Sequence, residues 1–113
     1  MGMATRLIDP NHAIDYLVKV APEYAKAKAE RIYLEEFRKS KKAILMQEHA
    51  DKPIGAQERE AYAHKEYIGL LAALQVAIET EETLRWKMVA AQARVEVWRT
   101  QSANDRNQDR ATA

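Results

Sequence analysis

A heptad pattern of apolar residues between positions 67 and 102 constrains this chain more than any other feature. Apolar side chains recur there at alternating spacings of three and four residues, which is typical of a long helix that packs along a partner helix. One position of this seam holds a carboxylate, Glu81, where the pattern requires a hydrophobe. The pattern therefore predicts an architecture and indicates little about chemistry. The apolar members of the seam are Tyr67, Leu70, Leu74, Ala77, Leu84, Met88, Ala91, Val95 and Trp98.

The composition favours helix throughout, and the net charge selects no partner. The 113 residues leave room for one domain, and only three Gly and three Pro interrupt a chain rich in strong helix formers. The formal charge of +1 comes from 18 basic and 17 acidic residues. Because the chain has no cysteine, a disulfide framework and a thiolate metal site are both excluded. No alternating β-branched run is long enough for a strand, so we predict an all-α fold.

The sequence predicts a protein that makes no membrane contact. No segment approaches the run of about 20 apolar residues that is needed to span a bilayer. Charged and polar residues are scattered through the first 20 positions, so this part lacks the apolar stretch of a secretory signal. We therefore expect a soluble protein of the cytoplasm.

Proline and glycine divide the chain into segments. Asp9 followed by Pro10 favours a helix start, because the carboxylate can cap the first turn and proline fits within it. Pro22 lacks an N–H donor and clashes with the preceding turn, so we expect a break or kink there. Positions 51–55 form the clearest turn, and positions 64–65 mark a local irregularity. The predicted segments are a loose N-terminus (1–9), a short helix (10–21), a long helix (22–50), a turn (51–55), a second long helix (56–103) and a polar tail (104–113) that frays.

Two long helices joined by a tight turn should fold back as an antiparallel hairpin. With Ile54 at the tip, Glu81 falls beside Lys28, and Arg31 lies one turn away. We therefore expect a register-setting ion pair between Glu81 and either Lys28 or Arg31, because such a pair specifies alignment more than it adds stability. The apolar stripe of the first long helix comprises Tyr24, Ala27, Leu34, Phe37, Ile44 and Leu45.

The second long helix carries more apolar surface than one neighbouring helix can cover. Its apolar arc widens near the start, and a further stripe appears opposite the main seam beyond position 85. A helix that is apolar on two sides usually lies between partners. We therefore predict a homo-oligomer, a dimer or larger, in which hairpins assemble into a helical bundle. The candidate interface residues are Leu71, Val76, Trp86, Val89 and Val97.

A basic cluster in the first long helix is the sharpest local charge feature. Positions 38, 41 and 42 share one helix face, which could contact a phosphate backbone. Glu35 and Glu36 precede the cluster, and a charge run of this length is also typical of a solvated helix face. Both interpretations stay open. The candidate nucleic-acid-binding residues are Arg38, Lys39, Lys41 and Lys42.

No catalytic or metal-binding pattern is present in the sequence. It lacks a glycine-rich phosphate loop, a nucleophile elbow and a cysteine nucleophile. It also lacks the paired Glu-x-x-His motifs of di-metal helix bundles, and its three histidines lie far apart. We expect no enzymatic activity, no metal and no cofactor.

Three stretches resemble small phage and prophage proteins of unassigned function. They are Ala29–Ala43 (AERIYLEEFRKSKKA) and the second-helix segments 84–86 and 91–99. The likeness covers residues 12 to 110, and Lys65 departs from a proline expected at that position. Such proteins are commonly encoded among recombination and early replication genes, so the resemblance implies a nucleic-acid setting in a host bacterial cytoplasm. It identifies no functional residue.

Two functional hypotheses follow from these observations. The first is a non-enzymatic phage accessory protein that supports DNA recombination or replication by binding DNA or a recombination protein. The second is a protein-interaction module, such as a scaffold or an inhibitor of a host nuclease or defence complex. Steep salt dependence of DNA affinity would favour the first hypothesis, since phosphate binding releases counterions.

Overall fold

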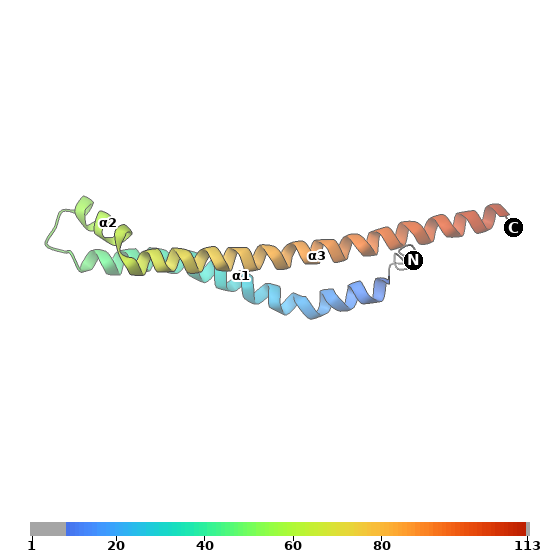
Figure 1. Cartoon of the computed structure of the whole chain (residues 1–113), viewed down its shortest axis with the longest axis horizontal. Helices are drawn as coiled ribbons and strands as arrows, with labels where there is room; N and C mark the ends of the chain where they lie inside the picture. The colour runs from blue at the N-terminus through green and yellow to red at the C-terminus, as the bar shows by residue number, and fades with distance from the viewer. Residues whose placement is uncertain (1–8, 113) are drawn as a thin grey trace. The chain divides into compact units, whose positions relative to one another are not determined.

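The computed structural model describes residues 9–112, and these residues form three α-helices. They are α1 (Pro10–Gln47), α2 (Ile54–Ala63) and α3 (Lys65–Thr112), and no strand occurs in this range. Figure 1 shows α1 packed against α3 in the opposite chain direction. The predicted all-α helical hairpin is therefore confirmed.

The chain divides into two compact units, each built from a part of α1 and a part of α3. The terminal unit contains Met1–Tyr24 and Thr83–Ala113, and the tip unit contains Ala25–Glu82. The tip unit includes all of α2 and the turn before it. Each unit therefore holds one antiparallel pair of helical segments.

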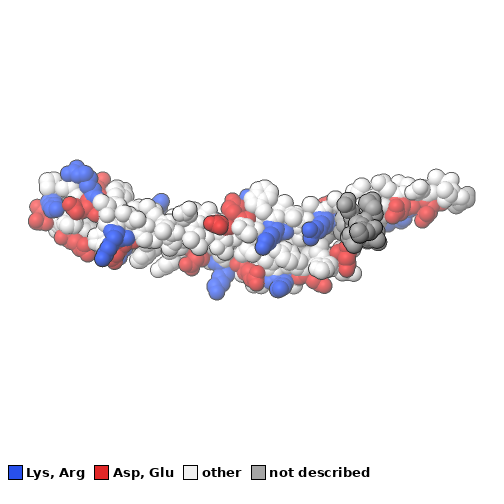
Figure 2. Space-filling view, in the orientation of Figure 1, with Lys and Arg blue, Asp and Glu red and all other residues white. Residues whose placement is uncertain are grey.

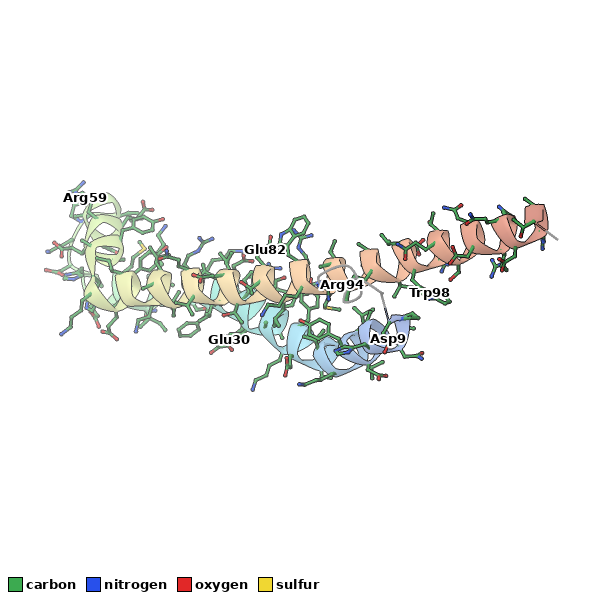
Figure 3. All side chains as sticks on the ribbon, turned by 45° about the vertical axis from the view of Figure 1, so that its right-hand side comes forward. Asp9, Glu30, Arg59, Glu82, Arg94 and Trp98 are labelled. Carbon is green, nitrogen blue, oxygen red and sulfur yellow. The ribbon has the colours of Figure 1, made fainter. Side chains whose placement is uncertain are left out.

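The heptad seam of α3 is the packed stripe in both units. In the tip unit Tyr67, Leu74 and Ala77 are each 7% exposed, and Ala91 is 3% exposed in the terminal unit. The exception is Trp98, which is 39% exposed and projects from α3 (Figure 3). The remaining apolar members are half-buried: Leu70, Leu84, Met88 and Val95.

The packed stripe of α1 is also a heptad seam, and it differs from the apolar stripe that the sequence suggests. Its members recur at alternating spacings of four and three, and three of those in the tip unit are cationic. Ile44, which we expected in the stripe, is 49% exposed, while Leu45 is only 1% exposed. The stripe comprises Ala13, Leu17, Val20 and Tyr24 in the terminal unit, and Ala27, Arg31, Leu34, Arg38, Lys41 and Leu45 in the tip unit.

Of the break or kink expected at Pro22, the break is wrong, because α1 continues through Pro22 without interruption. Proline removes the hydrogen bond to the carbonyl of the residue four positions earlier. That residue is Val18, whose side chain is 71% exposed, and Pro22 is exposed as well. Water can therefore solvate the free carbonyl, and the helix tolerates the proline.

The start of α1 follows the prediction, since the Asn11 backbone N–H donates to Asp9 Oδ1 at 3.0 Å. The tip differs in detail from the predicted boundaries. The first helix ends at Gln47 rather than at position 50, and the turn occupies positions 48–53. The rest of the expected loose N-terminus, 1–8, lies outside the described residues.

The predicted irregularity at positions 64–65 divides the second long helix into α2 and α3. His64 adopts an extended backbone with ψ 137°, and its N–H donates to the Ala61 carbonyl at 3.2 Å. Its ring then caps the next helix, because the Glu66 backbone N–H donates to His64 Nδ1 at 3.0 Å. One histidine therefore ends α2 and starts α3.

The polar tail is helical in the structure, which corrects the predicted boundary at position 103. Helix α3 continues to Thr112, whose hydroxyl donates to the Gln108 carbonyl at 3.2 Å. No proline or glycine lies beyond position 103 to end the helix. Residues 104–112 are all exposed, so the main-chain ladder continues there without side-chain burial.

A small core at the tip joins all three helices. Leu45 of α1, Ala61 of α2 and Tyr67 of α3 form a buried cluster, with Met46 packed against it. The Tyr62 ring meets the Tyr67 ring edge-on, with centroids 5.4 Å apart. This cluster fixes α2 against the hairpin.

We expect Leu45→Ala to lower the free energy of unfolding by about 2–5 kcal/mol, because it removes a fully buried side chain and leaves a cavity. Urea unfolding followed by circular dichroism, at one fixed protein concentration, measures this change. Ile54→Ala is the matched control, since Ile54 is 67% exposed, and it should change stability by less than about 0.5 kcal/mol. Equal effects of the two substitutions would contradict the assigned core.

Candidate functional site

An ion pair replaces apolar contact at one level of the tip-unit seam. Arg31 Nε donates to Glu81 Oε1 at 2.6 Å, and Arg31 Nη2 donates to Glu81 Oε2 at 3.1 Å. Arg31 Nη1 also donates to Glu35 Oε2 at 3.1 Å, one turn along α1. The Glu81 residue is only 8% exposed. This bidentate geometry fixes the guanidinium of Arg31 and the carboxylate of Glu81 in one relative orientation.

These hydrogen bonds show which of the two predicted residues pairs with Glu81. Lys28 is exposed and makes no ion pair with the described residues, whereas Arg31 meets Glu81 directly. The hydrogen bonds to Glu81, and then those to Glu35, raise the pKa of the Arg31 guanidinium above its ordinary value. The charged form is therefore held at every accessible pH, and the pair fixes α1 and α3 in one alignment.

Carboxylates pair with most of the basic cluster that the sequence identified. Lys39 Nζ lies 3.3 Å from Glu36 Oε2, on the same helix. Lys41 Nζ lies 2.8 Å from Glu66 Oε1 at the start of α3. Lys42 also has a carboxylate neighbour, since its Nζ lies 3.8 Å from an oxygen of Glu58 in α2. The cluster is thus largely neutralised within the tip unit.

Arg38 differs from the three lysines, because it has no carboxylate partner among the described residues. It lines an open hollow of about 470 Å³ together with Lys39, Lys42, Tyr62 and Tyr67. Cations beside aromatic rings are a combination that single-stranded nucleic acid uses, through phosphate contact and base stacking. The hollow is therefore the place where the basic cluster retains a free charge.

Lys42 is held in this hollow by an aromatic ring. Its Nζ lies 4.7 Å from the centroid of the Tyr62 ring. A hydrogen bond with Tyr62, and then the charge of Glu58, raises the pKa of the Lys42 ammonium. Lys42 thus fastens α1 to α2 and is less available to an outside anion than Arg38 is.

Histidines and glutamates gather around the turn without forming a metal site. His49 Nε2 lies 3.9 Å from Glu60 Oε2, and His64 Nε2 lies 3.9 Å from Glu48 Oε2. Lys52 Nζ also lies 3.4 Å from Glu60 Oε1. Across residues 9–112 no group of three or more such side chains could hold a metal ion. These polar contacts cross the turn, and the one between Lys52 and Glu60 is an ion pair.

The five interface candidates are all exposed, but they do not share one face. Leu71 and Val76 belong to the tip unit and are 39% and 63% exposed. At 100° per residue they lie about 140° apart around α3, on opposite sides of the seam. Trp86, Val89 and Val97 belong to the terminal unit, and Arg85 lies over the Trp86 ring at 4.6 Å. The candidates therefore mark at least two surfaces.

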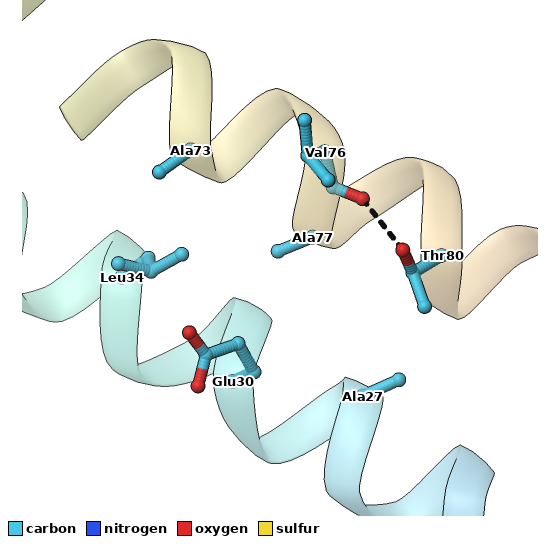
Figure 4. A pocket seen from close by; sticks show the side chains of 7 residues that line it. All are labelled: Ala27, Glu30, Leu34, Ala73, Val76, Ala77 and Thr80. Carbon is cyan, nitrogen blue, oxygen red and sulfur yellow. Dashed lines mark hydrogen bonds between the residues drawn. The ribbon is translucent and has the colours of Figure 1, made fainter. Parts of the chain in front are cut away.

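The side of the tip unit that carries Val76 is hollowed by small residues, which sequence reasoning did not identify as a site. An open groove of about 410 Å³ runs there between α1 and α3. Figure 4 shows Glu30 at its rim and Ala73 and Ala77 on the α3 wall. The Thr80 hydroxyl donates to the Val76 carbonyl at 2.9 Å, so it is satisfied within the helix. The groove is lined by Ala27, Glu30, Leu34, Ala73, Val76, Ala77 and Thr80.

The terminal unit has a hollow with a basic lining, which sequence reasoning also missed. His12 and Tyr16 of α1 line it with Lys87 and Arg94 of α3. Neither Lys87 nor Arg94 forms an ion pair with the described residues. The signal in the sequence was the seven-residue spacing of Lys87 and Arg94, which places both on one face of α3.

Comparisons with protein families, with curated proteins and with solved structures find no match to this chain. None of the described helices is both long enough and apolar enough to cross a membrane. Functional inference for this protein therefore rests on its own residues.

We expect Glu81→Ala to lower the thermal unfolding midpoint, because it leaves the Arg31 guanidinium in the seam with Glu35 alone. The double variant Arg31→Leu/Glu81→Leu should recover the midpoint or exceed it, since apolar residues of similar volume commonly replace such pairs without loss. Thermal unfolding followed by circular dichroism measures both. A double variant less stable than Glu81→Ala would contradict the assigned role.

The pair between Lys41 and Glu66 should make stability depend on pH. The hydrogen bond from Lys41 lowers the pKa of the Glu66 carboxyl below its ordinary 4.5. A depressed folded-state pKa contributes stability that is present above the unfolded value and is lost as pH falls through the folded value. We expect Glu66→Gln to lower the thermal midpoint at pH 7 and to leave it nearly unchanged at pH 3.

Lys41→Met is the matched control for this prediction, because it removes the same pair and keeps Glu66 in the first turn of α3. It should remove the same pH-dependent difference. If Lys41→Met retained the full pH dependence, the end of the helix would be responsible for the Glu66 effect rather than Lys41.

Proposed function

We propose that this protein is a non-enzymatic helical interaction module that acts as a scaffold and associates first with copies of itself. The observation that carries the proposal is the balance between buried and exposed apolar residues. Among the described residues, the buried hydrophobes larger than alanine are Val20, Leu45, Tyr67 and Leu74. Fifteen large hydrophobes are exposed over the same range.

The exposed hydrophobes lie in both units, and those of α3 in the terminal unit follow one side of the helix. Isolated surface hydrophobes are ordinary, whereas contiguous apolar rows mark interaction surfaces. In the terminal unit Trp86, Val89 and Val97 are 57%, 39% and 46% exposed along one side of α3. In the tip unit the members are Ile32, Tyr33, Ile44, Ile54, Tyr62, Ile68, Leu71, Val76 and Ile78.

Nucleic-acid binding is the second candidate function, and the free charge of Arg38 favours it. Pairing of Lys39, Lys41 and Lys42 with glutamates reduces the charge that a phosphate backbone would meet. The net charge also gives little long-range attraction for DNA, because the chain carries a formal charge of only +1. Self-association therefore takes precedence, and any DNA contact is expected to be weak and sensitive to salt.

The resemblance to phage proteins supplies the biological setting of the proposal. A scaffold of this kind would serve recombination or replication by holding a protein partner, or DNA, against its own assembly. Inhibition of a host nuclease or defence complex needs the same kind of apolar surface. Both roles require binding without catalysis, which agrees with the absence of catalytic motifs in the sequence.

Light scattering with and without a short single-stranded oligonucleotide tests the proposal. We expect a mass of at least twice the 12.9 kDa of one chain at micromolar concentration. Oligonucleotide should add to this mass at low salt only, and charge reversal of Arg38, Lys39, Lys41 and Lys42 should abolish the addition. A monomer at all concentrations would overturn self-association. Tight oligonucleotide binding at moderate salt would instead favour nucleic-acid binding as the main function.

A further inference from the structure

One side of the tip unit carries two parallel rows of residues without a charge. On α1 the row is Tyr33, Phe37, Ser40 and Ile44, and on α3 it is Gly69, Ala73, Val76 and Thr80. Both rows repeat the spacings four, three and four, so each follows one flank of its helix. We call these eight residues the uncharged face, and the exposed carboxylate of Glu30 continues the α1 row at one end of it. In a chain of which 31% is charged, such a face is a departure from the average surface.

The two rows lie on the same side of the hairpin. The groove in Figure 4 brings Glu30 and Leu34 of α1 together with Ala73, Val76 and Thr80 of α3. Phe37 follows Glu30 by seven residues, so both project from the same flank of α1. Figure 2 shows that charged side chains of both signs gather at the end of the tip unit and that fewer of them appear on the adjoining surface.

The two rows differ in side-chain size, and the difference is complementary. The α1 row carries bulky apolar groups, among them Tyr33 and Phe37, whose rings stack with centroids 5.7 Å apart. The α3 row carries small groups and borders the groove. Tyr33, Ile44 and Val76 are 59%, 49% and 63% exposed, so these apolar groups are not used within the chain. A large row and a small row on one face fit a second copy of that face.

We infer that the uncharged face is the contact between two copies of this chain, related by a two-fold axis parallel to the helices. Under this symmetry α1 of each copy lies on α3 of the other copy, in antiparallel direction. This inference rests on the proposed self-association and names the surface that makes it. The result is a four-helix bundle with both tips at one end.

The register within one chain fixes which residues face each other across the axis. Arg31 pairs with Glu81, and Lys41 pairs with Glu66, so the residue numbers of facing positions sum to about 110. A two-fold axis along the helices keeps each residue at the same height in both copies. Phe37 then faces Ala73 of the second copy, and Tyr33 faces Val76 of the second copy. Each ring of one copy therefore meets a smaller side chain of the other.

Charge favours this face over the opposite flank. Two helices, each about 10 Å wide, carry the eight residues over a height of about 21 Å. The footprint is about 420 Å² per copy, or about 840 Å² for the pair, which is the size of a weak, concentration-dependent interface. The opposite flank carries Leu71 and Ile78, but Lys28, Lys39 and Lys42 interrupt it. Burying that flank would remove water from unpaired or exposed charges.

Cysteine cross-linking tests the inference, because the chain has no cysteine of its own. The full-length variants Phe37→Cys and Ala73→Cys, one carrying a tag that shifts its mobility, are mixed and bridged with a short thiol-reactive linker. We expect the mixed product Phe37→Cys with Ala73→Cys to dominate. The matched control is a mixture of Lys39→Cys and Gln75→Cys, which places thiols at similar heights on the opposite flank and should give little product.

A second measurement follows the oligomer itself. Ala73→Glu should weaken association by about tenfold or more, since it places an unpaired carboxylate inside the contact. Gln75→Glu, its control on the opposite flank, should leave association unchanged, and circular dichroism should show that both variants keep their helices. Dominant cross-linking in the control mixture, or of Phe37→Cys with itself, would overturn the face or its pairing while self-association stands. A wild-type monomer would overturn the proposed function as well.

Discussion

The small apolar area that two antiparallel helices can bury is the constraint on which the rest of this structure depends. Each helix covers one stripe of the other, and the stripe supplies the only continuous core that such a pair has. Here five of the nine buried hydrophobes among the described residues are alanines, and Leu45 is the one large side chain that is fully enclosed. The rest of the apolar surface remains on the outside. A chain with this balance has a physical reason to associate, because association buries what folding leaves exposed.

Charges within the seam give the hairpin its alignment. A uniform apolar stripe would allow α1 to slide along α3 by a heptad at little cost, since each position would meet a similar neighbour. Arg31 and Glu81 oppose that shift, because sliding would break their bidentate ion pair. Glu81 is only 8% exposed, so its charge would be left buried without this partner. Lys41 and Glu66 repeat the constraint at the start of α3. The same alignment places the bulky row of α1 level with the small row of α3.

The α3 seam could be predicted from the sequence because its apolar residues keep the heptad spacing over nearly the whole helix. The α1 seam could not, since Arg31, Arg38 and Lys41 occupy packed positions while Ile44 points outward. Hydrophobicity alone therefore placed Phe37 and Ile44 in the packed stripe of α1, where the structure has Arg38 and Lys41. Arg31 and Lys41 pair with Glu81 and Glu66 on α3, so no local pattern in α1 could have indicated these cross-helix pairs.

The prediction of helix boundaries also depended on surroundings that the local sequence does not show. Pro22 predicts a break from local chemistry, but the carbonyl that it frees belongs to an exposed residue and can be solvated. His64 was recognised as an irregularity, yet its role as the cap of α3 depends on a ring hydrogen bond that spacing does not reveal. The basic cluster was visible in the sequence, whereas its neutralisation by Glu58 and Glu66 required the fold.

The neutralised charges and the uncharged face lead to one view of recognition. Long-range attraction selects partners by charge, and in this chain Lys39, Lys41 and Lys42 are already matched by glutamates. What remains to discriminate partners is shape at short range: bulky rings on one helix and a small-residue groove on the other. Such a surface is most complementary to itself, because any copy brings both the rings and the groove. A foreign partner would have to present the same alternation of sizes along two helices. Self-association is therefore the interaction that we propose for this surface, and further partners would then bind to the resulting assembly.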